Sequence, residues 1–273
     1  MKILVVYFSP TSNTKKIATE IIRAFTENGA QVDEKDITLP TDRSVPLDFS
    51  QYDAVSFGFP IYINRAPAIV REWLRTLDGG GKKSSTFFTY GGMGNHPAHR
   101  STRAILERRK FEVVSSAEFL GKHTFNLVGW EAMEERPNRS DLETAREYAF
   151  RTMKRFSGED KECPAEFPKG RADDNALDQI EVDWKASLPQ FPSRMGEDCS
   201  MCMACENLCP SGAIDADKGE VEKDKCILCL RCVGSCTDQA LKFCDLSKMF
   251  DDLLGGMGTT KEEIALKKSQ LFF

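Results

Sequence analysis

The chain has 273 residues, of which 41% are hydrophobic and 29% charged, and its formal net charge is −5 at pH 7. This length allows two domains, and the composition is that of a globular protein that can bury a core. The apolar run at residues 1–8 is too short for a signal peptide or a membrane span, and no later run is long enough. These features exclude a membrane role and predict a cytoplasmic protein, in which cysteine thiols stay reduced.

The negative charge is concentrated near the C-terminus. Residues 195–245 contain ten acidic and five basic side chains, so this segment alone carries the whole net charge of −5. An acidic segment disfavours nucleic acid as a ligand and favours a partner that has a basic docking face.

The N-terminal segment combines a strand, a polar loop and a helix. Residues 2–8 are almost continuously apolar, which is typical of a strand buried on both faces of a parallel sheet. Residues 15–28 have apolar side chains at helical spacing, and Gly29 ends them. A helix N-terminus in this position offers free N–H groups to a phosphate monoester. The loop adds five polar side chains, where a helix cap alone needs only one: Ser9, Thr11, Ser12, Asn13 and Thr14.

The run from Tyr7 to Thr14 resembles the FMN-phosphate loop of the flavodoxin superfamily, although related loops usually have Gly where this chain has Pro10 and Ser12. The resemblance implies that two further loops contact the flavin ring, both at the carboxyl ends of strands. The first follows a strand at residues 53–58 and contains Pro60, Ile61, Tyr62, Ile63 and Asn64. The second follows a strand at residues 84–90 and contains Thr89, Tyr90, Gly91, Gly92 and Gly94.

Within these loops, Tyr62 is the candidate for stacking on the ring, the alternative being that it only covers the end of the sheet. Glycines allow the backbone to approach a flat ring closely. His96 is a candidate for tuning the flavin or moving a proton, and His99 and His123 are weaker candidates. The segment at residues 121–138 either flanks the flavin or docks a second domain, and the sequence does not decide between them.

The remaining elements predict a flavodoxin-like α/β fold, a doubly wound sheet of five parallel strands over residues 1–157. Residues 30–37 form an edge strand and residues 112–122 the fifth strand, with helices at 66–77, 98–110 and 140–156. Residues 158–194 are rich in proline and charge and are expected to be a linker with at most a short helix. Residues 246–273 are expected to be a helical tail, with a capping box at residues 260–263.

Two cysteine runs with identical spacing occupy residues 195–245. The spacing C-x₂-C-x₂-C-x₃-C ligates [4Fe–4S] clusters, and in two-cluster ferredoxins the fourth cysteine of each run binds the other cluster. We therefore expect a C-terminal two-[4Fe–4S] ferredoxin domain with one cluster on Cys199, Cys202, Cys205 and Cys236. The other cluster is expected on Cys226, Cys229, Cys232 and Cys209.

Zinc and disulfides are the alternatives for these cysteines. Structural zinc sites use pairs of cysteines with four ligands in all, which fits this double run less well. Disulfides are disfavoured in a reducing compartment. Cys163 and Cys244 lie outside the spacing and are interpreted as ordinary thiols.

With both ends considered, the chain resembles the flavodoxin–ferredoxin fusion proteins of anaerobes. The resemblance implies an electron-transfer protein that contains FMN and two [4Fe–4S] clusters and serves a redox partner. Two alternatives remain: an FMN-dependent reductase of a small substrate that the clusters supply with electrons, and a ferredoxin with a flavin-free docking domain. The sequence also leaves open a head-to-tail homodimer, in which the flavin of one chain meets a cluster of the other.

Overall fold

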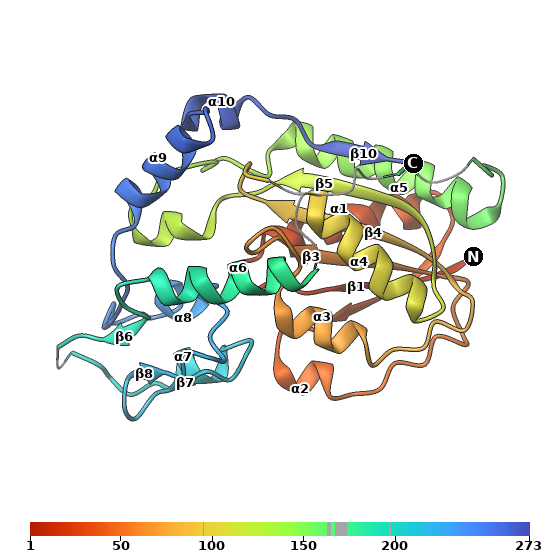
Figure 1. The fold of residues 1–273 in the computed structure, drawn as a ribbon. Helices are drawn as coiled ribbons and strands as arrows, with labels where there is room; N and C mark the ends of the chain where they lie inside the picture. Colours follow the sequence, from red (N-terminus) through yellow and green to blue (C-terminus); the bar gives the residue numbers. More distant parts are fainter. Residues whose placement is uncertain (95, 163–164, 167–173, 197) are drawn as a thin grey trace.

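The computed structural model describes residues 1–94, 96–162, 165–166, 174–196 and 198–273. Its centre is a sheet in the order β10-β5-β4-β3-β1-β2 (Figure 1). All neighbouring strands are parallel except β10, which pairs antiparallel with β5. The strands are β1 (Lys2–Tyr7), β2 (Gln31–Asp36), β3 (Ala54–Pro60), β4 (Lys83–Tyr90), β5 (Glu112–Leu120) and β10 (Gln270–Phe272).

The prediction of five strands was one strand short. The sixth strand, β10, comes from the end of the chain, where only helices were expected. Residues 113–120 of β5 are buried, so an uncovered β5 edge would expose a long row of backbone groups to other chains. The pairing of Leu271 with Ala117 covers that edge. Three residues are too few to give a recognisable strand pattern in the sequence.

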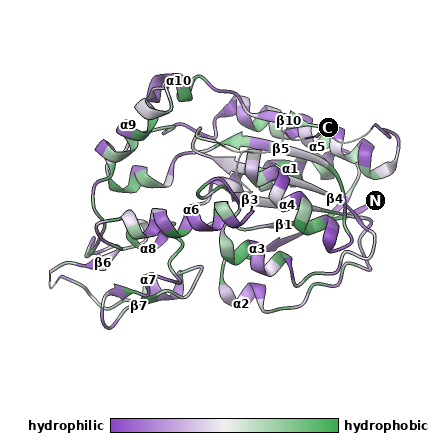
Figure 2. Ribbon diagram, viewed as in Figure 1, coloured by the Kyte–Doolittle hydropathy of each residue, from purple (hydrophilic) through white to green (hydrophobic). Residues whose placement is uncertain are grey.

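Helices cover both faces of the sheet because its strands alternate apolar side chains between the two faces. On one face, Leu4 and Val6 pack in a core with α3 (Ala68–Leu74) and α4 (His96–Arg108). On the other face, Ile3 and Val5 pack with α1 (Asn13–Glu27) and α5 (Arg139–Ser157). These helices carry both hydrophobic and hydrophilic residues, as expected of helices that cover a core (Figure 2).

The cysteine-rich segment lies beside the sheet and contains only short elements (Figure 1). Two further short elements, α2 and η1, lie outside the helices and strands that the sequence predicted. These two elements are α2 (Pro40–Arg43) and η1 (Thr124–Val128). In and beside the cysteine-rich segment, the short elements are β6 (Ser193–Arg194), α7 (Ala204–Asn207), β7 (Ile214–Asp215), β8 (Glu220–Val221), α8 (Arg231–Gly234) and β9 (Leu241–Lys242).

The predicted linker contains a substantial helix, α6 (Asp174–Ser187), of 14 residues. Buried Arg65 and Arg71, from the segment after β3, both donate to the carboxylate of Glu181 on α6. Asp178, one turn earlier, accepts from Arg65 as well. These contacts fix α6 against the sheet domain and therefore fix where the cysteine-rich segment begins.

After that segment the chain returns to the sheet domain. The helix α9 (Ser247–Gly256) is followed by α10 (Lys261–Ala265), which begins with the predicted capping box of Thr260 and Glu263. Phe250 and Leu254 of α9 and Ile264 of α10 share a hydrophobic core with Trp130 of the sheet domain. In the part of the chain that is described, no helix is long and apolar enough to span a bilayer.

Candidate functional site

A cavity of about 360 Å³ opens at the carboxyl ends of the parallel strands. In a doubly wound sheet of this order, ligands bind at this edge, at the switch point between β1 and β3. The loops after β1, β3 and β4 line the cavity. The predicted residues in its wall are Ser9, Thr11, Asn13, Thr14, Pro60, Ile61, Tyr62, Ile63, Asn64, Thr89, Tyr90, Gly91 and Gly94.

The side chains of the first loop mainly organise the loop itself. The Ser9 hydroxyl accepts from the Lys15 backbone N–H at 2.9 Å, and the Thr14 hydroxyl is 2.7 Å from that of Thr89. Asn13 donates to the Lys122 carbonyl oxygen at 2.8 Å. A serine hydroxyl that accepts a hydrogen bond retains its own proton for a ligand. The loop therefore presents hydroxyl groups at the N-terminus of α1 in a geometry that these contacts fix.

Two predicted residues, Ser12 and Gly92, do not line the cavity. Ser12 has φ 68° and is exposed, which is the conformation that glycine adopts more readily. Gly92 has φ 87° and turns toward the tail, where an added Cβ would come within 2.5 Å of the Met133 side chain. Both positions therefore act on the shape of their loops rather than on the cavity surface.

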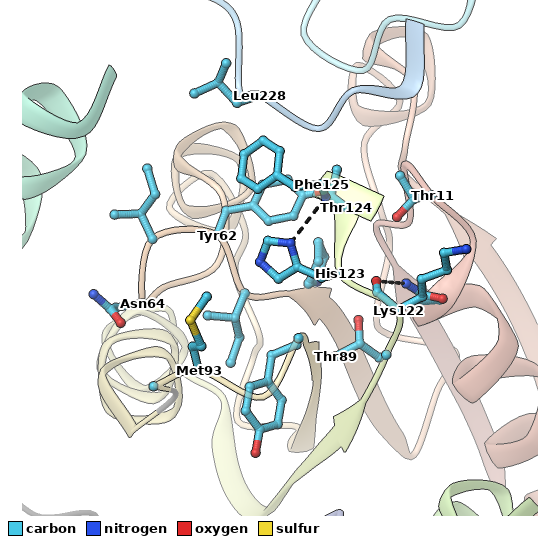
Figure 3. Close-up of a pocket in the computed structure, with 18 of the residues that line it drawn as sticks. Thr11, Tyr62, Asn64, Thr89, Met93, Lys122, His123, Thr124, Phe125 and Leu228 are labelled. Carbon is cyan, nitrogen blue, oxygen red and sulfur yellow. Dashed lines mark hydrogen bonds between the residues drawn. The ribbon is translucent and has the colours of Figure 1, made fainter. Parts of the chain in front are cut away.

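Tyr62 lies between the cavity and the cysteine-rich segment. The residue is partly exposed, whereas its hydroxyl is buried beside Thr124. Burial raises the pKa of this hydroxyl well above its usual range, and the nearby Cys229 thiol raises it further. In Figure 3, Tyr62 lies beside Thr124 and Phe125, with Leu228 on the side of the second cysteine run. The residue predicted to stack on a ring thus also touches the region of the second cysteine run.

About half of the residues that line the cavity were not predicted from the sequence. The segment after β5 was left undecided, and the other missed residues come from α6, the second cysteine run and α9. No local pattern marks them, because they reach the cavity only through the packing of segments far apart in sequence. They are Gly121, Lys122, His123, Thr124, Phe125, Ile180, Trp184, Ile227, Leu228, Phe250, Leu253 and Met257, with Pro10 and Met93 from the predicted loops.

His123 is the histidine that the structure brings to the cavity (Figure 3). Burial lowers its pKa to about 4, so the ring is neutral at neutral pH. Its Nδ1 accepts from the Phe125 backbone N–H at 3.2 Å, which leaves the proton on Nε2. An added Cβ on Gly91 would overlap this ring. His123 therefore offers a neutral N–H donor beside the cavity.

His99 lies elsewhere. His99 is fully buried, where it contacts Ser116 at 2.6 Å and Glu118 at 3.1 Å. These contacts make His99 a core residue that does not line the cavity. His96 begins α4, but its side chain lies outside the described residues, as does Cys163.

The two cysteine runs have the same backbone conformation at positions 27 residues apart. The helices α7 and α8 each have four residues and begin after a residue in the left-handed region. Left-handed conformations are uncommon for residues other than glycine, so their repetition reflects a shared loop shape. The matching pairs are Met201 and Leu228 (φ 56° in both), Met203 and Leu230 (60° and 54°), and Gly212 and Gln239 (60° and 53°).

The thiols form two neighbouring groups. Burial raises the pKa of Cys229 well above its usual range, and the thiols of Cys232, Cys226 and Cys209 raise it further. Cys209, the last cysteine of the first run, thus lies with the second run.

The first run shows the reciprocal arrangement. Burial raises the pKa of Cys205, and the thiols of Cys236 and Cys199 act in the same direction. Cys236, the last cysteine of the second run, thus lies with the first run. In the described part of the chain, no group of three or more His, Cys, Asp or Glu is arranged to hold a metal ion. A [4Fe–4S] cluster requires a wider arrangement, because its four thiolates bind different iron atoms.

The second run lies directly against the sheet domain. Ile227 and Leu228, which separate Cys226 from Cys229, line the cavity. Nearby, Arg43 of α2 donates to the Pro210 carbonyl oxygen at 2.5 Å. One wall of the cavity is therefore the loop that carries the second group of thiols.

The fold and the cavity define a doubly wound α/β domain with a ligand site at the switch point. The model of the flavodoxin domain family matches residues 4–122. The N-terminal part of the chain is therefore a flavodoxin-like domain.

Several solved flavodoxins are similar to this part of the chain. A flavodoxin from the domain Archaea has 18% identity and a TM-score of 0.45, and the alignment covers 57% of this chain and 99% of that one. Flavodoxin 1 from Bacillus cereus has 18% identity and a TM-score of 0.42, with coverage of 56% and 98%. The two-electron reduced flavodoxin of Megasphaera elsdenii has 23% identity and a TM-score of 0.37, with coverage of 55% and 98%. A search of curated proteins gave no match.

Proposed function

We propose that this protein is an electron carrier that binds FMN in the cavity and two [4Fe–4S] clusters on its cysteine runs. The observation that carries the proposal is the shared wall: Ile227 and Leu228 of the second run line the same cavity as the flavodoxin-like loops. A flavin exchanges electrons singly or in pairs, whereas each cluster exchanges one at a time. A protein that joins them converts between two-electron and one-electron chemistry.

Three properties of the cavity support FMN as its ligand. The N-terminus of α1, with Ser9 and Thr11 beside it, offers N–H and hydroxyl donors for a phosphate. The wall beyond it is mainly apolar and aromatic, as a flat ring system requires. His123 adds a neutral donor for a polar edge of the ring.

Two observations support the clusters. The runs share their spacing and their left-handed positions, which is the form of a two-cluster ferredoxin. Cys209 packs in one cluster with Cys226 of the second run, and Cys236 in one cluster with Cys205 of the first run, which is compatible with exchange of the fourth ligand. The ligand sets would be Cys199, Cys202, Cys205 and Cys236 for one cluster and Cys226, Cys229, Cys232 and Cys209 for the other.

The partner of such a carrier would be a redox protein with a basic docking face, since residues 195–245 carry a net charge of −5. Nucleic acid does not fit this charge. A head-to-tail dimer is not needed for contact between the cofactors, because the cavity and the second run meet within one chain.

A reductase of a small apolar substrate is the second candidate. Three exposed apolar side chains, Ile180 of α6 and Leu253 and Met257 of α9, stand at the cavity. They would bind an apolar acceptor such as a quinone next to the ring. The test is the rate at which added quinone reoxidises the reduced protein. A rate that saturates with quinone concentration would favour the reductase, whereas a rate that rises linearly with concentration would favour the carrier.

The first experiment is anaerobic purification with measurement of FMN, iron and acid-labile sulfide in the same sample. The expected result is about one FMN with about eight iron and eight sulfide per chain. If the protein contains about eight iron and eight sulfide but binds no FMN even after FMN is added, the first domain is a docking module. FMN without iron would remove the cluster proposal.

A further inference from the structure

We infer a fixed order of electron transfer: flavin, the cluster on Cys226, Cys229, Cys232 and Cys209, the cluster on Cys199, Cys202, Cys205 and Cys236, and then the partner. We call these the inner and the outer cluster. The inference rests on the proposed function and adds the route. Each step would move one electron, so a fully reduced flavin would give up two electrons in succession, one to each cluster, and would release its protons to solvent. The reverse direction would run the same steps backward.

The inner cluster would be next to the flavin because its loop forms part of the cavity. Leu228 lines the cavity and is only 6% exposed. Tyr62 lines the same cavity as Leu228, and its hydroxyl is buried. Flavin and inner cluster would therefore be separated by the width of the Leu228 and Tyr62 side chains.

The outer cluster occupies the equivalent position of the repeat but faces solvent. Met201 matches Leu228 in position and in φ, yet it is 41% exposed. Cys202, which matches Cys229, is exposed, whereas Cys229 is buried. The two cysteine runs therefore share left-handed backbone positions but differ in how deeply they are buried.

The two groups of thiols are neighbours, which the route requires. Buried Cys232 of the inner group packs in one cluster with Cys205 and Cys236 of the outer group. The opposite order would require a partner to reach the inner cluster first. That order is disfavoured, because Cys226, Cys229 and Cys232 are all buried.

The test uses the full chain with both clusters, in the presence and absence of FMN. Two readouts are followed: the EPR spectrum of each reduced cluster, and the rate at which a chelator removes iron. Cys229→Ala and Cys202→Ala assign the signals to the inner and outer clusters. Leu228→Ala and Met201→Ala are a matched pair that retains every cysteine, so they serve if a cysteine variant fails to fold.

We expect FMN to alter the inner-cluster spectrum and to slow removal of half of the iron at least tenfold. We expect Leu228→Ala to lose most of this protection and Met201→Ala to retain it. The inference is overturned if FMN and iron are both bound but FMN affects the outer cluster, or both clusters equally. It is also overturned if Met201→Ala has the larger effect. A chain that binds no FMN or no iron overturns the proposed function itself, which the same samples reveal before any variant is compared.

Discussion

Arg65 donates a hydrogen bond from Nη2 to Oε1 of Glu181 at 2.8 Å, although 116 residues separate the two in sequence. Arg65 is 2% exposed, and the same carboxylate also accepts from buried Arg71 at 2.8 Å. Glu181 thus pairs with both buried guanidinium groups, and Asp178 of the same helix supplies the second carboxylate. These ion pairs hold α6, which lies in the predicted linker, against the sheet domain. The cysteine-rich segment that follows α6 therefore starts from a fixed position.

Glu181→Ala is expected to destabilise the protein by about 3–5 kcal/mol, because it leaves two buried guanidinium groups without this carboxylate. The measurement is the thermal unfolding midpoint, together with limited proteolysis near α6. Asp178→Ala is the matched control, since the Asp178 side chain is 59% exposed and water can replace it. Equal effects of the two substitutions would contradict this interpretation.

His123 is expected to stay neutral in the folded protein well below pH 6. Burial lowers its pKa to about 4, whereas an unfolded chain has a histidine pKa of about 6.5. The unfolded state therefore binds more protons between these values, and the free energy of unfolding decreases as pH falls through that window. At pH 5 this loss amounts to about 2 kcal/mol.

The measurement is an NMR titration of the His123 ring, with unfolding midpoints of the wild type and His123→Gln at pH 7 and pH 5. The wild type should lose more stability on acidification than His123→Gln. A ring that titrates near pH 6.5 would show that burial does not control its ionisation.

Gly91→Ala is expected to weaken FMN binding at least tenfold, because an added Cβ overlaps the His123 ring and must displace one wall of the cavity. The measurement is the quenching of FMN fluorescence during titration of the apoprotein. Gly255→Ala in α9 is the control: no atom lies within 4 Å of its added Cβ, so affinity should not change. An unchanged affinity for Gly91→Ala would mean that His123 does not shape the binding site.

Removal of residues 268–273 is expected to lower the unfolding midpoint by several degrees and to promote association. The truncation uncovers the edge of β5 and removes Phe273, whose ring packs on Tyr148 and lies 3.9 Å from the Arg151 guanidinium. Light scattering and thermal unfolding measure the two effects. Leu266→Ser, at a residue that is 80% exposed, should change neither.

The sequence alone predicted the elements whose signal is local. The apolar run of β1, the helical period of α1 and the turn residues after each strand were enough for the α/β fold and for three of the cavity loops. The cysteine spacing predicted the repeat, because ligand spacing is itself a local property. The capping box of α10 was predicted for the same reason, since its two partners are three residues apart.

Only the tertiary structure decided what depends on contacts between distant segments. The strand β10 forms by pairing with the edge of β5. No property of residues 270–272 alone indicates this pairing. His123, after β5, reaches the cavity, whereas His99, on α4, is buried with Glu118 of β5. Leu228 and Met201 hold equivalent places in a sequence repeat, and only packing against the sheet domain buries the first and leaves the second exposed. Burial is a property of the assembled chain, so a sequence pattern that repeats cannot by itself assign different environments to its two copies.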